Sequence, residues 1–154
     1  MSEKIDPILR RALPEDAMAV TDLVQRAFAQ YTPLIGKPPA PALYDYTVLI
    51  ASGRVSLAED GSGLLGVIYS YVEADGAVML DVLAVSQAAQ GRGIAKRLIQ
   101  HVEDRARVEG ARLMRVYTNA VMTGPQAIYP RLGYHETHRG ESDGYRRIHY
   151  EKPL

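Results

Sequence analysis

The chain contains no cysteine among its 154 residues. Disulfides, cysteine-based zinc sites and a catalytic thiolate are therefore excluded. The chain also has no excess of either charge, because 18 basic and 18 acidic side chains balance to a formal net charge of +0. A balanced chain offers no broad electrostatic attraction, and we expect it to bind neither nucleic acid nor a membrane surface.

Long apolar runs are missing as well. No run approaches the ~18 residues that a membrane span needs, and the start Met1-Ser2-Glu3-Lys4 lacks the apolar core of a secretory signal. We find no internal repeat or linker. Length and composition predict one cytoplasmic domain over residues 1–154. The histidines have no metal-binding spacing such as H-E-x-x-H, so we predict no metal site.

Apolar spacing predicts the element order β-α-α-β-β-β-α-β-α-β-β. Strands are expected over residues 8–13, 54–59, 64–72, 77–85, 113–118, 134–139 and 145–152. Helices are expected from residue 14 to at least 28, from 41 to about 51, and over 94–109 and 125–132, with an ordered loop over 31–41. This order indicates an α+β domain with an antiparallel meander first and one βαβ crossover later.

A glycine-rich stretch joins the predicted strand 77–85 to the predicted helix 94–109. It consists of Gln90, Gly91, Arg92, Gly93, Ile94 and Ala95. Glycines at such a junction let backbone N–H groups approach a ligand, and the positive end of the helix dipole favours phosphate or pyrophosphate there. Taken alone, the glycines are as typical of a plain turn. Lys96 replaces the third glycine of the dinucleotide fingerprint, and a G-K-[ST] ending is absent.

Three motifs in order resemble those of the GCN5-related N-acetyltransferases. Residues 90–95 match the family's Q/R-x-x-G-x-G/A signature, and residues 128–134 resemble its L-Y-x-x-L-G-F/Y segment. The strand that holds pantetheine in the family is matched by Leu83, Ala84 and Val85. The element order also agrees from Ile8 to the C-terminus. The resemblance implies a central mixed, mostly antiparallel sheet flanked by helices, and direct acetyl transfer from acetyl-CoA to an amine.

The resemblance also implies where acetyl-CoA is held. The amides of residues 90–95 would bind its pyrophosphate, with charge added by Arg92 and Lys96 unless these are ordinary solvated side chains. Strands 77–85 and 113–118 would splay apart, so that unpaired backbone groups of Leu83 and Val85 bond the pantetheine amides. The alternative is a fully paired core strand. The expected cofactor-binding residues are Leu83, Ala84, Val85, Gln90, Gly91, Arg92, Gly93, Ile94, Ala95 and Lys96.

Two catalytic residues are expected. Tyr129 matches the family tyrosine that donates a proton to the leaving thiolate; the alternative is a core tyrosine. Asp81 is our candidate general base, because a carboxylate in an apolar run needs a purpose or a partner. Two residues before Leu83, it is expected to share that residue's face; its alternative role is a structural ion pair or hydrogen bond. Tyr117 stands where some relatives carry a glutamate base.

The acceptor side is expected around the loop over residues 31–39, which resembles a Y-x-x-x-I-G-x-x-P stretch of a bacterial subgroup. The candidate acceptor-binding residues are Tyr31, Asp45 and Asn119. Asp45 would attract an ammonium group, and the tyrosines Tyr31, Tyr44 and Tyr46 form an aromatic wall or else pack in the core. Met122 replaces a cofactor-contacting asparagine that many relatives carry.

The function expected from these observations is acetylation of a primary amine of a small molecule. The neutral charge and the proline-stiffened loop favour a small acceptor over the alternative, a protein or peptide acetyltransferase. A non-catalytic acyl-CoA sensor is the rival from another class: the missing glutamate and asparagine favour it, and Tyr129 opposes it. The oligomeric state stays open, with a homodimer as one expectation.

Overall fold

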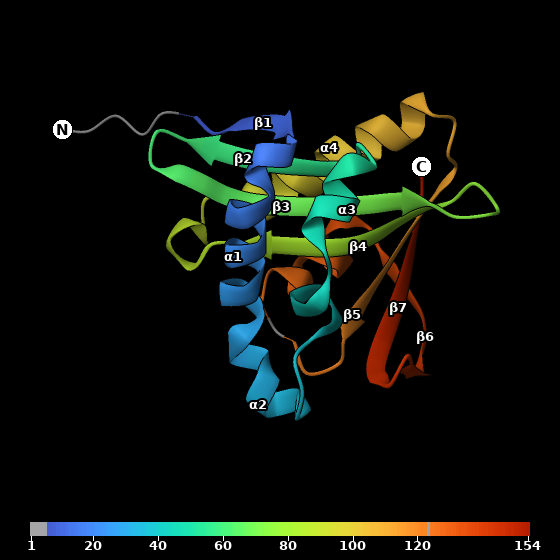
Figure 1. Ribbon diagram of the computed structural model, residues 1–154. Helices are drawn as coiled ribbons and strands as arrows, with labels where there is room; N and C mark the ends of the chain where they lie inside the picture. Colours follow the sequence, from blue (N-terminus) through green and yellow to red (C-terminus); the bar gives the residue numbers. More distant parts are fainter. Residues whose placement is uncertain (1–5, 123) are drawn as a thin grey trace.

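The computed structural model describes residues 6–122 and 124–154; the charged start of the chain lies outside them. Within this part, a seven-stranded sheet has the order β1-β2-β3-β4-β5-β7-β6 (Figure 1). Its strands are β1 (Ile8–Arg11), β2 (Val55–Asp60), β3 (Gly63–Val72), β4 (Val78–Val85), β5 (Leu113–Asn119), β6 (His135–Ser142) and β7 (Tyr145–Pro153). The β4–β5 pair is parallel and the other neighbours are antiparallel. The predicted mixed, mostly antiparallel sheet is confirmed.

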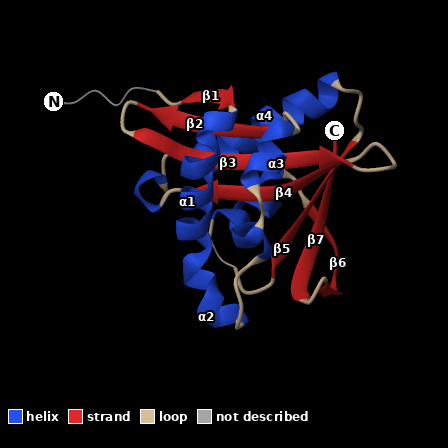
Figure 2. Cartoon of the chain, viewed as in Figure 1, coloured by secondary structure: helices blue, strands red, loops and turns tan. Residues whose placement is uncertain are grey.

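Helices cover both faces of the sheet (Figure 2). The near face in the figure carries α1 (Ala17–Phe28) and α3 (Tyr46–Ala51), and α2 (Thr32–Ile35) follows below α1. The far face carries α4 (Ile94–Val108), and the 3₁₀ helix η5 (Pro125–Leu132) packs in the same core as α4. The predicted apolar rows bury one face of α1 and of α4, so the sheet lies between two cores. Among the described helices, none is long and apolar enough to cross a membrane.

The segment between α1 and α3 differs from the prediction. Helix α2 occupies part of the expected loop and ends at Gly36, whose φ of 85° lies in the left-handed region that glycine tolerates. The expected helix from residue 41 begins only at Tyr46, because a 3₁₀ turn (Ala40–Leu43) ends in extended backbone at Tyr44. Asp45 then caps α3 by accepting a hydrogen bond from the amide of Thr47 at 3.0 Å.

Strands β4 and β5 separate partway along their length. Their pairing runs only from Val78 opposite Met114 to Leu80 opposite Val116, while β5 continues against β7 as far as Asn119. A fork therefore opens beyond Leu80, on the side of the sheet where β4 leads toward the glycine-rich stretch. The expected splaying of these two strands is present.

A β-bulge lies at the mouth of this fork. In the β3–β4 ladder Ser70 pairs with Leu80 and Tyr69 pairs with Val82, which leaves Asp81 without a partner. The extra residue interrupts the two-residue alternation of side chains. Leu83 thus packs in the core on the α4 side, whereas Asp81 faces the other side with Tyr117. The expectation that Asp81 shares a face with Leu83 is wrong for this reason.

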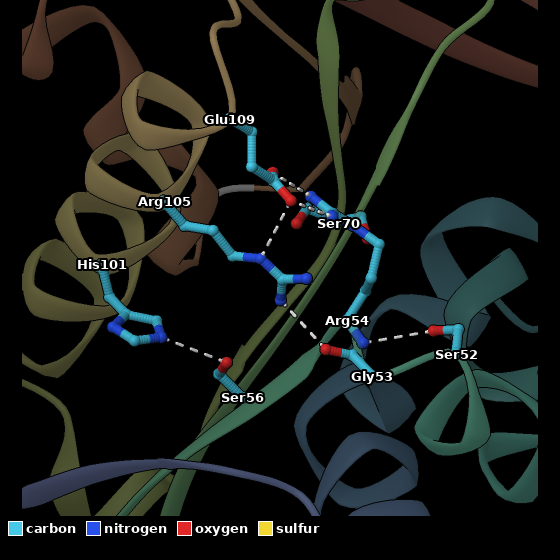
Figure 3. Close-up of polar contacts among 8 residues, drawn as sticks. All are labelled: Ser52, Gly53, Arg54, Ser56, Ser70, His101, Arg105 and Glu109. Carbon is cyan, nitrogen blue, oxygen red and sulfur yellow. Dashed lines mark hydrogen bonds and ion pairs between the residues drawn. The ribbon is translucent and has the colours of Figure 1, made fainter.

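A polar cluster ties the C-terminal end of α4 to the start of β2 (Figure 3). Arg54 donates from Nη1 and Nη2 to the Glu109 carboxylate at 3.0 and 3.2 Å, and from Nε to the carbonyl of Ser70 at 3.0 Å. Arg105 reaches the carbonyl of Gly53 at 3.0 Å. The cluster fixes one end of α4 on the sheet, and the other end of the same helix carries the glycine-rich stretch.

Candidate active site

The glycine-rich stretch leads directly into the N-terminus of α4. Gly91 and Gly93 have φ values of 83° and 75°, and Gly93 is the N-cap of the helix. A Cβ built on either glycine would meet no described atom within 4 Å, so bare backbone borders open space there. Such an arrangement suits an anion, since helix-terminal amides and the dipole act together.

An open groove runs along this backbone. Seven of the ten predicted cofactor-binding residues line it: Val85, Gln90, Gly91, Gly93, Ile94, Ala95 and Lys96. Arg131 of η5 also lines the groove and adds a cation that the sequence analysis missed, although it stands inside the L-Y-x-x-L-G segment. The groove therefore combines bare amides with two basic side chains.

Three predicted cofactor-binding residues lie elsewhere. Arg92 pairs with Asp60 at 3.1 Å and so ties the stretch to the end of β2. Ala84 is buried in the core on the α1 side. Leu83 lies at the fork, where its carbonyl accepts a hydrogen bond from Nε2 of Gln126 at 3.1 Å. The carbonyl expected to meet pantetheine is thus already bonded to a side chain.

Gln126 itself is buried within the fork. Its Oε1 is the one buried side-chain oxygen or nitrogen without a hydrogen-bond partner among the described residues. A buried amide oxygen of this kind is costly unless a donor reaches it. An amide N–H of a pantetheine chain is such a donor, so this residue fits the expected cofactor. The sequence offered one clue, a polar residue three positions before Tyr129 on the same short helix.

A second cavity lies at the mouth of the fork and brings several predicted site residues together. Its polar lining comprises Asp81, Tyr117, Thr118, Asn119, Gln126, Tyr129, Tyr145 and Arg147. Tyr31 and Asp45 do not line it: Tyr31 packs on Phe28 with ring centroids 6.1 Å apart, and Asp45 is the helix cap described above. Of the three expected acceptor residues, only Asn119 is at the cavity.

Asp81 is surrounded by tyrosines. The hydroxyl of Tyr117 donates a hydrogen bond to its carboxylate, and Tyr44 approaches from the α1 side. Burial raises the pKa of Asp81, while Tyr117, Tyr44 and the charge of Arg147 pull in the opposite direction. Burial, together with the charge of Asp81, raises the pKa of Tyr44 to about 12. A carboxyl with a raised pKa is a stronger proton acceptor once it is ionised.

Tyr129 is buried at the inner end of the same cavity. Its ring packs edge-on against Tyr134, with centroids 5.3 Å apart, and at a tilt against Tyr150, with centroids 6.4 Å apart. Burial raises the pKa of its hydroxyl. The phenol therefore stays protonated at neutral pH, the state that a proton donor requires.

In residues 6–122 and 124–154, no group of three or more histidine, aspartate and glutamate side chains is arranged to hold a metal ion. The rings of His138 and His149 do stack, with centroids 4.1 Å apart, but as a lone pair.

A groove lined by bare backbone, an adjoining forked strand pair, and a carboxylate and a phenol in one cavity are the features expected of a CoA-dependent N-acyltransferase. The model of the acetyltransferase (GNAT) domain family matches residues 51–136, more than half of the chain. The chain belongs to this family and is a GNAT N-acetyltransferase that uses acetyl-CoA. None of the curated proteins compared with it matches.

Solved structures agree on the fold. The PaiA N-acetyltransferase of Thermoplasma acidophilum, solved with coenzyme A, has a TM-score of 0.76 at 16% identity, covering 97% of this chain and 100% of its own. Ard1 from Thermoplasma volcanium has a TM-score of 0.80 at 13% identity, over 97% and 99%. An IAA acetyltransferase from Bacillus cereus has a TM-score of 0.72 at 18% identity, covering 96% of this chain and 99% of its own. At these identities the likeness concerns the fold.

Proposed function

We propose that the protein acetylates the primary amine of a small molecule, with Asp81 as general base and Tyr129 as general acid. The observation that carries this proposal is the single cavity in which both side chains lie, at the mouth of the β4–β5 fork. The anion groove adjoins the cavity, because η5 contributes residues to both. Cofactor and acceptor can thus meet at the fork.

The loop after α2 supports a small acceptor. Pro39 and Pro41 line the cavity on its outer side. The loop is fastened to the β6–β7 hairpin, since the hydroxyl of Tyr145 donates to the carbonyl of Pro38 at 2.8 Å and Lys37 lies 4.2 Å from the centre of the Tyr145 ring. A proline-stiffened, fastened wall favours a compact amine over an extended peptide.

Acetyl-CoA supplies the thioester, whose C–S bond is exchanged for the C–N bond of the product amide. The amides around Gly91 and Gly93 hold the pyrophosphate, with Lys96 and Arg131 adding charge. Asp81 takes the proton that the ammonium group loses on becoming a nucleophile. Tyr129 gives a proton to the departing thiolate; because burial raises the pKa of its hydroxyl, the phenol still holds its proton when the thiolate forms.

The test is release of free thiol from acetyl-CoA across a panel of small amines and short peptides. We expect one or more small amines to be acetylated and the peptides to react poorly. Preference for peptide N-termini would replace the small-molecule proposal; the NatC complex, a structural neighbour, was solved bound to a Gag peptide and CoA. Tight CoA binding without turnover on any amine would favour the sensor.

A further inference from the structure

Arg147 is an unusual residue for its position on β7. It is only 7% exposed, although arginine is rarely buried without a strong reason. It lines the cavity that contains Asp81 and Tyr129. In the described lining of that cavity, Arg147 is the one cation and Asp81 the one carboxylate. The proposed mechanism assigns Arg147 no role.

The partners of Arg147 hold it in place and neutralise it only in part. Its Nη1 donates to Oδ2 of Asp143 at 2.8 Å and to Oγ of Ser142 at 3.2 Å. The side chain of Asp143 is 83% exposed, so water screens this ion pair. A guanidinium has five N–H donors, and these two bonds use one of its three nitrogens.

Aromatic rings fix the plane of the guanidinium. Its central carbon lies 4.1 Å from the ring centre of Tyr117 and 5.4 Å from that of Tyr145. Stacking of this kind stabilises the cation and orients the planar fork of donors that grips a carboxylate with two hydrogen bonds. The geometry is that of a prepared anion site.

Tyr117 links the two charges of the cavity. The face of its ring contacts Arg147, and its hydroxyl donates to Asp81. A cation and a carboxylate are therefore both held against the same phenol side chain, in the lining of one cavity. A ligand that carries an ammonium and a carboxylate a few bonds apart is complementary to such a pair.

We propose that the acceptor is an amino acid, whose amine faces Asp81 and whose carboxylate is bound by Arg147. This inference rests on the proposed function and names its substrate class. The apolar part of the lining includes Phe28, Pro39, Pro41 and Met122, which suit a small aliphatic side chain. Diamines and polyamines are excluded as good acceptors, because their second ammonium would meet Arg147.

The experiment compares amino acids with their decarboxylated amines. Thiol release is measured with phenylalanine against phenethylamine, leucine against isopentylamine, β-alanine against ethylamine, and putrescine alone. We expect kcat/KM to favour the better amino acid of the panel over its matched amine by ~10–100-fold, the range of one charge-assisted contact. Equal or faster turnover of the amines, or of putrescine, would overturn the proposal.

Variants on β7 locate the effect. Arg147→Gln is expected to remove the preference, mainly by raising KM for the amino acid, and Arg147→Lys to restore part of it. Loss of the charge also raises the pKa of Asp81, but this effect is common to both members of a matched pair and cancels in their ratio. Arg146→Gln is the control, since it removes the same charge from an exposed neighbour. A purely structural Arg147 would instead lower activity equally toward both members of each pair.

A binding measurement separates failure of this inference from failure of the proposed function. With CoA bound, an amino acid is expected to raise the melting temperature of the parent but not of Arg147→Gln, whereas CoA alone stabilises both. If no amine is acetylated, the proposed function fails, and this shift still decides the amino-acid site. If Arg147→Gln does not fold, the matched pairs on the parent decide alone.

Discussion

The hydroxyl of Tyr117 on β5 donates a hydrogen bond to the carboxylate of Asp81 on β4, across the point where the two strands part. Tyr117 stands at the position where the family resemblance led us to look for a glutamate base. The neighbouring strand thus brings a carboxylate to the place where that base is missing. The bulge at Asp81 makes this contact possible by turning its side chain toward Tyr117.

Asp81→Asn tests the general-base assignment. We expect slower turnover at neutral pH, loss of the acidic limb of kcat/KM, and partial recovery at high pH, where free amine is abundant. Because burial raises the pKa of Asp81, the acidic limb of the parent's kcat/KM profile should have its midpoint above pH 3.8, the ordinary carboxyl value. A pH profile of unchanged shape with a lower melting temperature would make Asp81 structural.

Tyr117→Phe is the companion variant, since it removes the hydrogen bond and keeps the carboxylate. That bond lowers the pKa of Asp81, so its loss should raise the pKa further and move the acidic limb to higher pH. A carboxyl whose pKa is raised by folding binds its proton more tightly in the folded state. Stability therefore falls as pH rises from the unfolded to the folded pKa, and we expect this fall to extend to higher pH in Tyr117→Phe.

Gly93→Val tests the pyrophosphate groove. The added Cβ would project into the open space beside the loop, and valine at a φ of 75° is also strained. We expect the melting-temperature shift caused by acetyl-CoA to disappear. Gly76→Val is the matched control, with a φ of 89° and equally open surroundings in the β3–β4 turn. It should lose similar stability and keep the shift; CoA binding by Gly93→Val with parental affinity would contradict the groove assignment.

Tyr129→Phe tests the proton donor. The ring contacts with Tyr134 and Tyr150 survive in phenylalanine, so we expect the melting temperature and the acetyl-CoA affinity to change little. Turnover should fall by ~10²–10⁴-fold, the usual contribution of general acid–base catalysis. Single-turnover kinetics measures the chemical step directly. Parental turnover in that experiment would remove Tyr129 from the mechanism.

Local patterns in the sequence predicted most of the fold. The apolar row on α4 and the turn signals between strands carry their information within a few residues, so the sheet, the long helix and the glycine loop were expected where they lie. The start of α3 was misplaced because Pro41 is equally suited to a 3₁₀ turn. Asp45 before an apolar helix is a recognisable capping signal, which was interpreted instead as an ammonium-binding group.

The candidate site depended on contacts that no local pattern encodes. A bulge inside the apolar run of β4 leaves no trace in the run itself, so the face of Asp81 was misassigned. Arg147 meets Tyr117 only because β7 inserts between β5 and β6. Gln126 was missed because its partner, the carbonyl of Leu83, lies 43 residues away in the sequence. Pairing over such separations is set by the assembled sheet.

The polar cluster at the far end of α4 yields a prediction about stability alone. Hydrogen bonds from Arg54 lower the pKa of Glu109, so the folded state holds the ionised carboxylate. A lowered carboxyl pKa adds stability above the unfolded value of 4.5, and this stability is lost as pH falls through the folded pKa. Glu109→Gln should therefore destabilise the protein at pH 7 by about 1 kcal/mol, the upper end for partly exposed pairs, or roughly 2–4 °C in melting temperature.

The difference in melting temperature between Glu109→Gln and the parent should shrink as the pH is lowered into the acidic range. Asp104→Asn is the control, because Asp104 is 78% exposed and pairs with Arg107 on the same helix. Loss of this pair should change the melting temperature by no more than the experimental error. Acetyl-CoA should stabilise both variants as it does the parent, since the cluster and the glycine loop lie at opposite ends of α4. A loss that is equal in the two variants, or constant with pH, would show that the cluster does not anchor the helix.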